Sequence, residues 1–172
     1  MKKIIIAAML FTCNIAYAQV TINNELNKFV GTWRWTSGND TVIIVLQKQV
    51  CNFLYSSKSA EILVGWHKYI KNGQNVEKST QNIGFNINSD DQNPATSRKI
   101  TLTGKNHGAN KIWFYNFCDL TLGKNCNLDF QLLTNSTTQA SWKLRNPQGI
   151  FVGPSNTNGK FTLPKNLILT KI

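Results

Sequence analysis

The sequence predicts an all-β protein built as a single antiparallel β-barrel. Three observations lead to this class. Hydrophobic residues alternate with polar residues at a period of two in segment after segment, turn residues separate these segments, and no helical repeats lie between them. A series of about eight to ten strands without intervening helices is typical of a barrel or a sandwich.

The N-terminal residues 1–18 have the three parts of a secretory signal. These parts are a basic start at Lys2 and Lys3, an apolar run over Ile4–Phe11, and a small-x-small end at Ala16–Ala18. The apolar run is shorter than the roughly 20 residues needed to span a bilayer, and no second such run follows. We therefore expect cleavage before Gln19, a secreted or periplasmic protein without a transmembrane segment, and one domain over 19–172. A lipid-anchored Cys13 is the alternative to this cleavage.

The first elements of the mature chain are expected to be a short helix and an amphipathic strand. The helix is predicted around Ile22–Lys28, with Asn23 or Asn24 as its N-cap. In the strand that follows, aromatic residues and a glycine alternate with mostly polar residues: Phe29, Gly31, Trp33 and Trp35 share one face. This strand should therefore have one buried face and one wet face.

Further strands are predicted in two kinds along the rest of the chain. Strands with one wet face contain Ile100 and Leu102, then Leu128, Phe130 and Leu132, then Trp142 and Leu144. Runs that are apolar on both faces cover Val42–Leu46, Ile62–Ile70 and Ile112–Phe117, and the last strand covers Lys165–Lys171 after Pro164. Turns are expected at Ser37–Asp40, Asn72–Gly73, Gly104–Asn110 and Asn146–Gly149, and a mobile surface loop at Asn88–Ser97.

The chain is strongly basic, with 19 Lys and Arg against 8 Asp and Glu and a formal net charge of +11. The basic residues are spread singly from Lys28 to Lys171 and do not gather in one run. Proteins that bind nucleic acid usually cluster such residues on one face, so no specific nucleic-acid partner is expected. A generally cationic surface fits an anionic component of the cell envelope as a partner.

Three cysteines remain after the predicted signal. Cys118 and Cys126 flank a turn-like segment that contains Gly123, so they are candidates for a disulfide across a hairpin in an exported protein. Cys51 is then left over. A leftover thiol is buried, reactive or paired with another molecule.

Catalytic and metal-binding patterns are weak. His67 and His107 are the two histidines, and they lack the close ligand spacing of zinc sites with Cys51, Cys118 or Cys126. No serine lies in a Gly-x-Ser-x-Gly elbow, and the acids Asp119, Asp129 and Asp90-Asp91 fall in or beside predicted turns. We therefore predict no catalytic residues, no metal and no cofactor.

The aromatic residues are the better indication of function. Five tryptophans are spread over several predicted strands and should converge inside a barrel. They either fill the interior or line a cavity for an apolar ligand. The cavity candidates are Trp66, His67, Tyr69, Trp113 and Tyr115.

Three segments resemble an uncharacterised family of small secreted bacterial proteins, a domain of unknown function. They are Leu26–Trp33, Ser141-Trp142 and Leu163–Lys171. More distantly, a short helix followed by Gly31-x-Trp33 is similar to the opening of lipocalins and other calycins. This resemblance implies a calycin-like barrel in which a late basic residue lies across Trp33 and closes one end. Arg145 matches that residue best by position, although it is out of phase with Trp142 and Leu144. Lys143, which has the same phase as Arg145, and Arg34 are the other basic residues that could be taken for the partner of Trp33.

Three functions follow as hypotheses. The leading one is a secreted, non-catalytic, lipocalin-like barrel that binds a small apolar ligand or an envelope component, with its site at the end away from Trp33. The alternative is a cationic interaction or inhibitor module that binds a macromolecule, whose binding should weaken with salt. The second alternative is a hydrolase, which requires a pocket with a base beside a nucleophile.

Overall fold

The computed structural model describes residues 20–52, 58–89, 99–147 and 159–172. Ten strands lie in these ranges: β1 (Val20–Thr21), β2 (Gly31–Ser37), β3 (Asp40–Asn52), β4 (Ser59–Lys71), β5 (Gln74–Lys78), β6 (Leu102–Asn106), β7 (Lys111–Asp119), β8 (Lys124–Leu132), β9 (Gln139–Arg145) and β10 (Asn166–Lys171). Three 3-10 helices accompany them: η1 (Asn24–Phe29), η2 (Thr80–Asn82) and η3 (Ile87–Ser89). The predicted signal at 1–18 and most of the predicted loop at Asn88–Ser97 lie outside the described residues.

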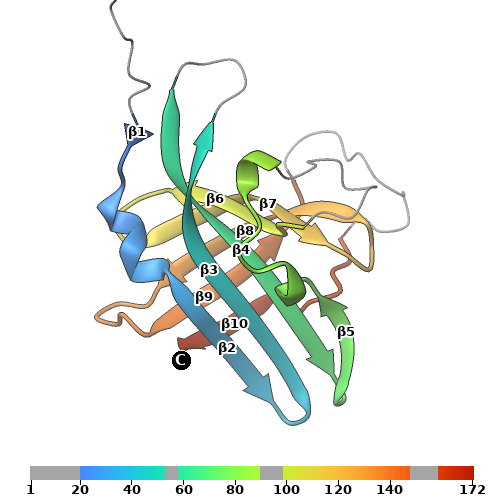
Figure 1. Ribbon diagram of the computed structural model, residues 1–172. Coiled ribbons are helices and arrows are strands. Elements are labelled where there is room, and N and C mark those ends of the chain that lie inside the picture. The colour runs from blue at the N-terminus through green and yellow to red at the C-terminus, as the bar shows by residue number, and fades with distance from the viewer. Residues whose placement is uncertain (1–19, 53–57, 90–98, 148–158) are drawn as a thin grey trace, which may run out of the picture.

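Eight of the strands form a closed antiparallel barrel. Their order around the ring is β4-β3-β2-β10-β9-β8-β7-β6, and a pairing between β4 and β6 closes it. The other two strands, β1 and β5, pair with β4 outside the ring. Figure 1 shows the long β3–β4 ribbon crossing the front of this barrel. The all-β, antiparallel barrel predicted from the period-two pattern is confirmed.

The short N-terminal helix predicted from the sequence is not seen as an α-helix. Residues Asn24–Phe29 form the 3-10 helix η1, and the side chain of Asn23 accepts a hydrogen bond from the Glu25 N–H at 3.1 Å. A segment this short gains too little from α-helical hydrogen bonds, whereas the tighter 3-10 turn is common in short pieces. Leu26 and Phe29 are fully buried, so η1 covers one end of the barrel.

Aromatic side chains fill the barrel interior. The Phe130 ring lies 5.0 Å from Trp33, 6.2 Å from Phe29 and 6.3 Å from Phe114, each in an edge-to-face arrangement. This geometry is the one that aromatic quadrupoles favour. An eight-stranded barrel has an interior just wide enough for its own side chains. The residues around Phe130 therefore form a packed core.

The strand β4 is buried on both faces. Its inner residues, such as Leu63, belong to the main core, while Ile62, Val64 and Trp66 form a second cluster on the outside of the barrel. Ile87 in η3 and Ile100, which precedes β6, pack with them in this outer cluster. The tertiary cover explains why Ile62–Ile70 is apolar on both faces.

The closed end of the barrel is built around Gly31 and Trp33, but its cation is Lys171. The Lys171 ammonium lies 5.5 Å from the centre of the Trp33 ring and donates a hydrogen bond to the Lys28 carbonyl at 3.1 Å. Gly31 has φ +129°, and a Cβ there would lie 2.9 Å from Lys171 Cε. Only glycine satisfies both conditions without strain.

The predicted contact between Trp33 and Arg145 is therefore replaced by one between Trp33 and Lys171. Arg145 instead forms an ion pair with Asp129 on the outer surface, because it is out of phase with the buried Leu144. Lys171 is the direct cross-strand partner of Trp33, so the register of β2 and β10 decides which cation reaches the indole.

Among the described residues, no helix is long and apolar enough to cross a bilayer.

Candidate functional site

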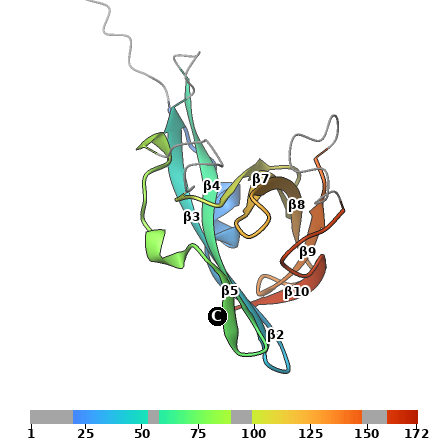
Figure 2. The same ribbon diagram turned by 90° about the vertical axis from the view of Figure 1, so that its right-hand side faces the viewer.

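The barrel wall is weakest where β2 meets β10. These strands pair at two positions, Thr170 with Arg34 and Lys171 with Trp33. Beyond Arg34, the strand β2 continues to pair with β3, and β10 continues to pair with β9, so each keeps its other neighbour. The two strands diverge from this point, as both views show (Figures 1 and 2).

A groove with a volume of about 450 Å³ lies in this opening, and we call it the β2–β10 cleft. Its apolar part comes from three strands, and its polar rim carries one cation. The lining residues are Trp35, Ser141, Trp142, Lys143, Asn166, Leu167 and Ile168. Neighbours along a strand point to opposite faces, so a groove lined by both Leu167 and Ile168 joins the core side of the sheet to its outer surface.

The indole of Trp142 is an unsatisfied donor in the wall of the cleft. The side chain is 1% exposed and packs edge-on against Phe117, with 5.4 Å between ring centres. Its Nε1–H has no hydrogen-bond partner in the described part of the chain. A buried donor without an acceptor costs about 1–3 kcal/mol. The Nε1 atom is itself buried, while the residue contributes to the wall of the cleft.

Two other buried tryptophans put Trp142 in context. The Trp33 Nε1–H donates to the Phe29 carbonyl at 2.8 Å, so this indole is satisfied within the fold. The Trp66 Nε1–H lacks a partner as Trp142 does, but Trp66 belongs to the outer cluster beneath η3 and does not line the cleft. The combination of an unsatisfied indole and an accessible groove thus occurs at Trp142.

A buried polar network lies behind the cleft wall, centred on His67. The His67 Nε2 is 2.6 Å from a Glu77 carboxylate oxygen, and its Nδ1 is 2.9 Å from the Thr101 hydroxyl. The Ser79 hydroxyl lies 3.0 Å from that of Thr101. Phe117 connects the network to the cleft, because its ring lies 5.0 Å from the His67 ring and 5.4 Å from the Trp142 ring.

The two carboxyl groups of this network have opposite pKa shifts. Burial would raise the pKa of Glu77, but the hydrogen bond and charge of His67 outweigh it, and the Thr121 N–H helps to bring it to about 2. Burial and the neighbouring Glu77 carboxylate raise the pKa of Asp119, although hydrogen bonds from Thr162 and Leu122 oppose them. The network therefore ties β4 and β5 to the β7–β8 turn and to the segment before β10.

The order hydroxyl, imidazole and carboxylate in Thr101, His67 and Glu77 is the order found in hydrolase triads. Here both Thr101 and His67 are 0% exposed. Both side chains are therefore closed off from solvent in this structure. The arrangement satisfies buried polar groups, which is the commoner use of such networks.

The two cysteines predicted as a disulfide are not joined. Phe117 is the cross-strand partner of Cys126, and Cys118 is that of Asn125. Because alternate residues point to opposite faces, Cys118 and Cys126 project from opposite sides of the hairpin. Burial raises the pKa of the Cys126 thiol to about 12, and it also raises the pKa of Cys51. Both thiols are therefore poor nucleophiles at neutral pH.

The predicted cavity residues do not come together. His67 and Tyr69 are on the inner face of β4, whereas Trp66 lies in the outer cluster. Trp113 and Tyr115 are on the outer face of β7, where Tyr115 is 41% exposed, because Ile112 and Phe114 occupy the inner positions. The alternation of inward and outward residues along each strand is the sequence signal that divides these five candidates between the two faces. The alternation pattern predicts Trp35 and Trp142 as inward-facing residues. Whether they line a cleft depends on where β2 and β10 stop pairing, which the pattern does not show.

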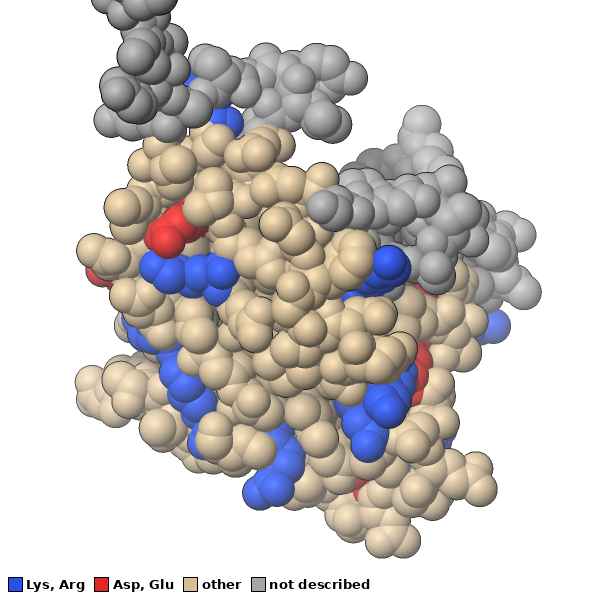
Figure 3. Space-filling view, viewed as in Figure 1, with Lys and Arg blue, Asp and Glu red and all other residues tan. Residues whose placement is uncertain are grey.

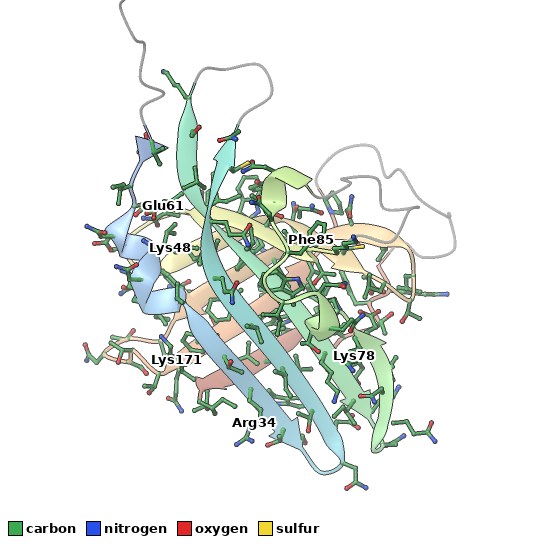
Figure 4. The ribbon with its side chains drawn as sticks, viewed as in Figure 1. Arg34, Lys48, Glu61, Lys78, Phe85 and Lys171 are labelled. Atoms are coloured by element: carbon green, nitrogen blue, oxygen red, sulfur yellow. The ribbon has the colours of Figure 1, made fainter. Side chains whose placement is uncertain are left out.

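The cations are dispersed over the face drawn in Figure 3. Arg34 and Lys78 lie apart on this side, and the Lys48 ammonium pairs with the Glu61 carboxylate at 3.0 Å near η1 (Figure 4). In the described ranges, no three His, Cys, Asp or Glu side chains are placed to hold a metal ion.

Comparisons with known proteins give a family but no activity. No curated protein and no solved structure matches the chain. A family model described as a family of unknown function, DUF6705, matches residues 1–172. The sequence resemblance to a domain of unknown function is thus confirmed over the whole chain, and the protein belongs to the DUF6705 family.

Proposed function

We propose that this protein is a non-catalytic binding protein that holds a small apolar ligand in the β2–β10 cleft. The observation that carries the proposal is that Trp142, whose buried indole N–H has no partner in the described chain, lines an accessible groove. Ligand sites typically combine apolar walls with a few polar groups that orient the ligand. The cleft has this composition.

The chemistry of the cleft defines the ligand class. Trp35, Trp142 and Leu167 offer apolar and aromatic contact, which suits a flat, largely hydrocarbon molecule. The Trp142 Nε1–H calls for one hydrogen-bond acceptor on that molecule, such as a carbonyl or ether oxygen. The volume of about 450 Å³ lies in the range of about 300–1,000 Å³ that is usual for ligand sites.

The site differs from that of a barrel with a ligand in its centre. Phe130, Phe114 and Trp33 fill the barrel near its closed end, so the ligand enters from the side, between two diverging strands. The cleft begins at Trp35, two residues along β2 from Trp33, so the proposed site is in the barrel wall and not at the end opposite Trp33. Behind this wall, Trp142 packs on Phe117, which in turn lies against His67.

The test uses the purified protein and 1-anilinonaphthalene-8-sulfonate, an apolar aromatic probe, with binding measured by calorimetry. Ile168 is 48% exposed in the cleft, so Ile168→Asp should fold normally and weaken binding at least about tenfold, because it places a charge in the apolar wall. Ile83→Asp is the matched control, since Ile83 is 45% exposed and does not line the cleft. Equal binding by both variants would refute the proposal.

A second pair of variants examines the hydrogen bond. Trp142→Phe keeps an aromatic ring and removes the N–H, and we expect a loss of about threefold to tenfold in affinity for the probe. Trp66→Phe removes the other unpartnered indole N–H and should leave the affinity unchanged. A loss in the Trp66 variant as large as in the Trp142 variant would mean that the probe reports on packing and not on the cleft.

A further inference from the structure

A second groove lies on the outer surface of β7, β8 and β9, away from the cleft. We call it the Trp113 groove, and it has a volume of about 290 Å³. It combines an aromatic residue, two amides, one carboxylate and several cations. The lining residues are His107, Lys111, Trp113, Asn127, Asp129, Arg145 and Asn146.

Strand register explains how these side chains come together. Lys105 is opposite Trp113, Trp113 is opposite Asp129, and Asp129 is opposite Lys143. Directly opposed side chains lie about 5 Å apart on one face of a sheet. The four residues therefore form a continuous row across β6, β7, β8 and β9, in the order cation, ring, carboxylate, cation.

Aromatic rings form one side of the groove. Trp113 makes an edge contact with Tyr115, at 6.3 Å between ring centres, and a tilted contact with His107, at 6.0 Å. The Lys105 ammonium lies 5.9 Å from the Trp113 ring. These rings lie outside the core, on a face where the neighbouring strand positions are polar. Exposed rings of this kind offer flat contact area to a partner.

The charged residues in and beside the groove are mostly cations, and they surround one carboxylate, that of Asp129. Asp129 accepts hydrogen bonds from Arg145 and forms an ion pair with Lys111 at 3.2 Å. Within the described ranges, Lys143 and Lys165 form no ion pair with a carboxylate. Both line a neighbouring groove of about 390 Å³, which shares Arg145 and Asn146 with the Trp113 groove. The two grooves thus form one track.

We infer that this track binds an acidic polysaccharide, a chain of sugar rings that carry carboxylates. The hydrocarbon faces of sugar rings pack on the Trp113 ring, and their carboxylates pair with Lys143, Arg145 and Lys165. Their hydroxyl groups donate to Asp129, which is already oriented by its two cations. The Asp129 carboxylate thus gives a ligand rich in hydroxyl groups a hydrogen-bond acceptor within the groove.

The position of Asp129 favours a polysaccharide over a nucleic acid. A phosphate backbone offers negative charges at close, regular spacing and is bound by donors and cations. A DNA backbone has no free hydroxyl group that could donate to Asp129, whereas the sugar rings of a polysaccharide carry several. The inference is independent of the β2–β10 cleft, because Trp113 and Asp129 do not line the cleft.

The experiment measures binding of polygalacturonate to the purified protein by calorimetry at several salt concentrations. Its methyl-esterified form, which keeps the sugar rings and loses the charges, is the matched ligand. We expect binding of the acidic polymer that weakens as salt rises, and at least about tenfold weaker binding of the ester.

Variants locate the binding. Trp113→Ala and Lys143→Ala should each weaken binding of polygalacturonate by about fivefold or more, and Lys143 is exposed, so its replacement should not disturb folding. Arg34→Ala removes an exposed cation from the other side of the barrel and is the control, expected to bind as the unchanged protein does. Equal affinities of all three variants would overturn the inference. Tighter binding of single-stranded DNA than of polygalacturonate would overturn it as well.

Discussion

The closed end of the barrel and the β2–β10 cleft are built from the same strands and have opposite properties. At the closed end, the indole N–H of Trp33 has an acceptor 2.8 Å away, a cation lies over its ring, and η1 covers it. At the cleft, the indole N–H of Trp142 has no partner in the described chain, and the strands on either side diverge. The satisfied tryptophan belongs to the construction of the barrel, whereas the unsatisfied one beside a groove is the basis of the proposed binding site.

The largest effect should come from removing the tryptophan of the closed end. Trp33→Ala is expected to lower the free energy of unfolding by about 3–5 kcal/mol, because it removes a fully buried indole from a packed core. Trp35→Ala, at the half-buried cleft position, should cost less than half as much. Urea denaturation of both variants measures the difference. Equal losses would mean that the cleft is as tightly packed as the closed end.

The next effect concerns the His67 network behind the cleft. Glu77 has a pKa of about 2 in the folded protein against an ordinary value of 4.5. Because the folded value is the lower one, the stabilisation is complete above pH 4.5 and disappears as the pH falls toward 2, an effect of about 3 kcal/mol. Glu77→Gln should remove this part of the pH dependence.

Urea denaturation at pH values from about 7 to about 3 measures this effect. Glu25→Gln is the control, since Glu25 is an exposed carboxylate in η1, and it should keep the pH dependence of the unchanged protein. A Glu77→Gln variant that loses stability over this range as steeply as the unchanged protein would show that Glu77 does not carry the effect.

A smaller effect separates backbone strain from side-chain crowding at the closed end. Gly31→Ala should cost about 1–3 kcal/mol, because φ is +129° and the new Cβ would meet Lys171 Cε. Gly73→Ala has φ +79° but open space around it, so it carries the strain without the crowding. The excess cost at Gly31 should therefore disappear in a Lys171→Ala background, as a thermal unfolding cycle would measure. An undiminished excess would assign the cost to the backbone alone.

The smallest effect concerns the cation over Trp33. Lys171→Met keeps the length of the side chain and removes the charge, and we expect a loss of about 1 kcal/mol. Lys143→Met, at the rim of the cleft, should change stability by less than about 0.5 kcal/mol, since its side chain is exposed. Thermal unfolding of the two variants at low salt makes the comparison. A larger loss at Lys143 would reverse the assignment of the two ends.

The alternation of apolar and polar residues predicts part of the candidate site, and strand pairing decides the rest. Strand phase correctly separates Trp142 from Lys143, so this inner position is readable from the sequence. The prediction of Trp66, Trp113 and Tyr115 as cavity residues rests on residue type alone. Strand phase places all three on the outer side of the barrel wall. The cleft itself is not a local property, because it arises where two strands distant in the chain pair over two positions and then separate.

The sequence by itself determined the eight strands of the barrel, the buried faces of the amphipathic ones and the glycine that closes one end, but not the outer strands β1 and β5. These features depend on the period of the side chains along a strand and on backbone conformations that few residues adopt. Only the tertiary structure decided that Lys171 and not Arg145 lies over Trp33, that Cys118 and Cys126 face opposite sides, and that Trp142 has an unsatisfied donor. Each of these depends on the register between strands, and register is set by the packing of the whole barrel.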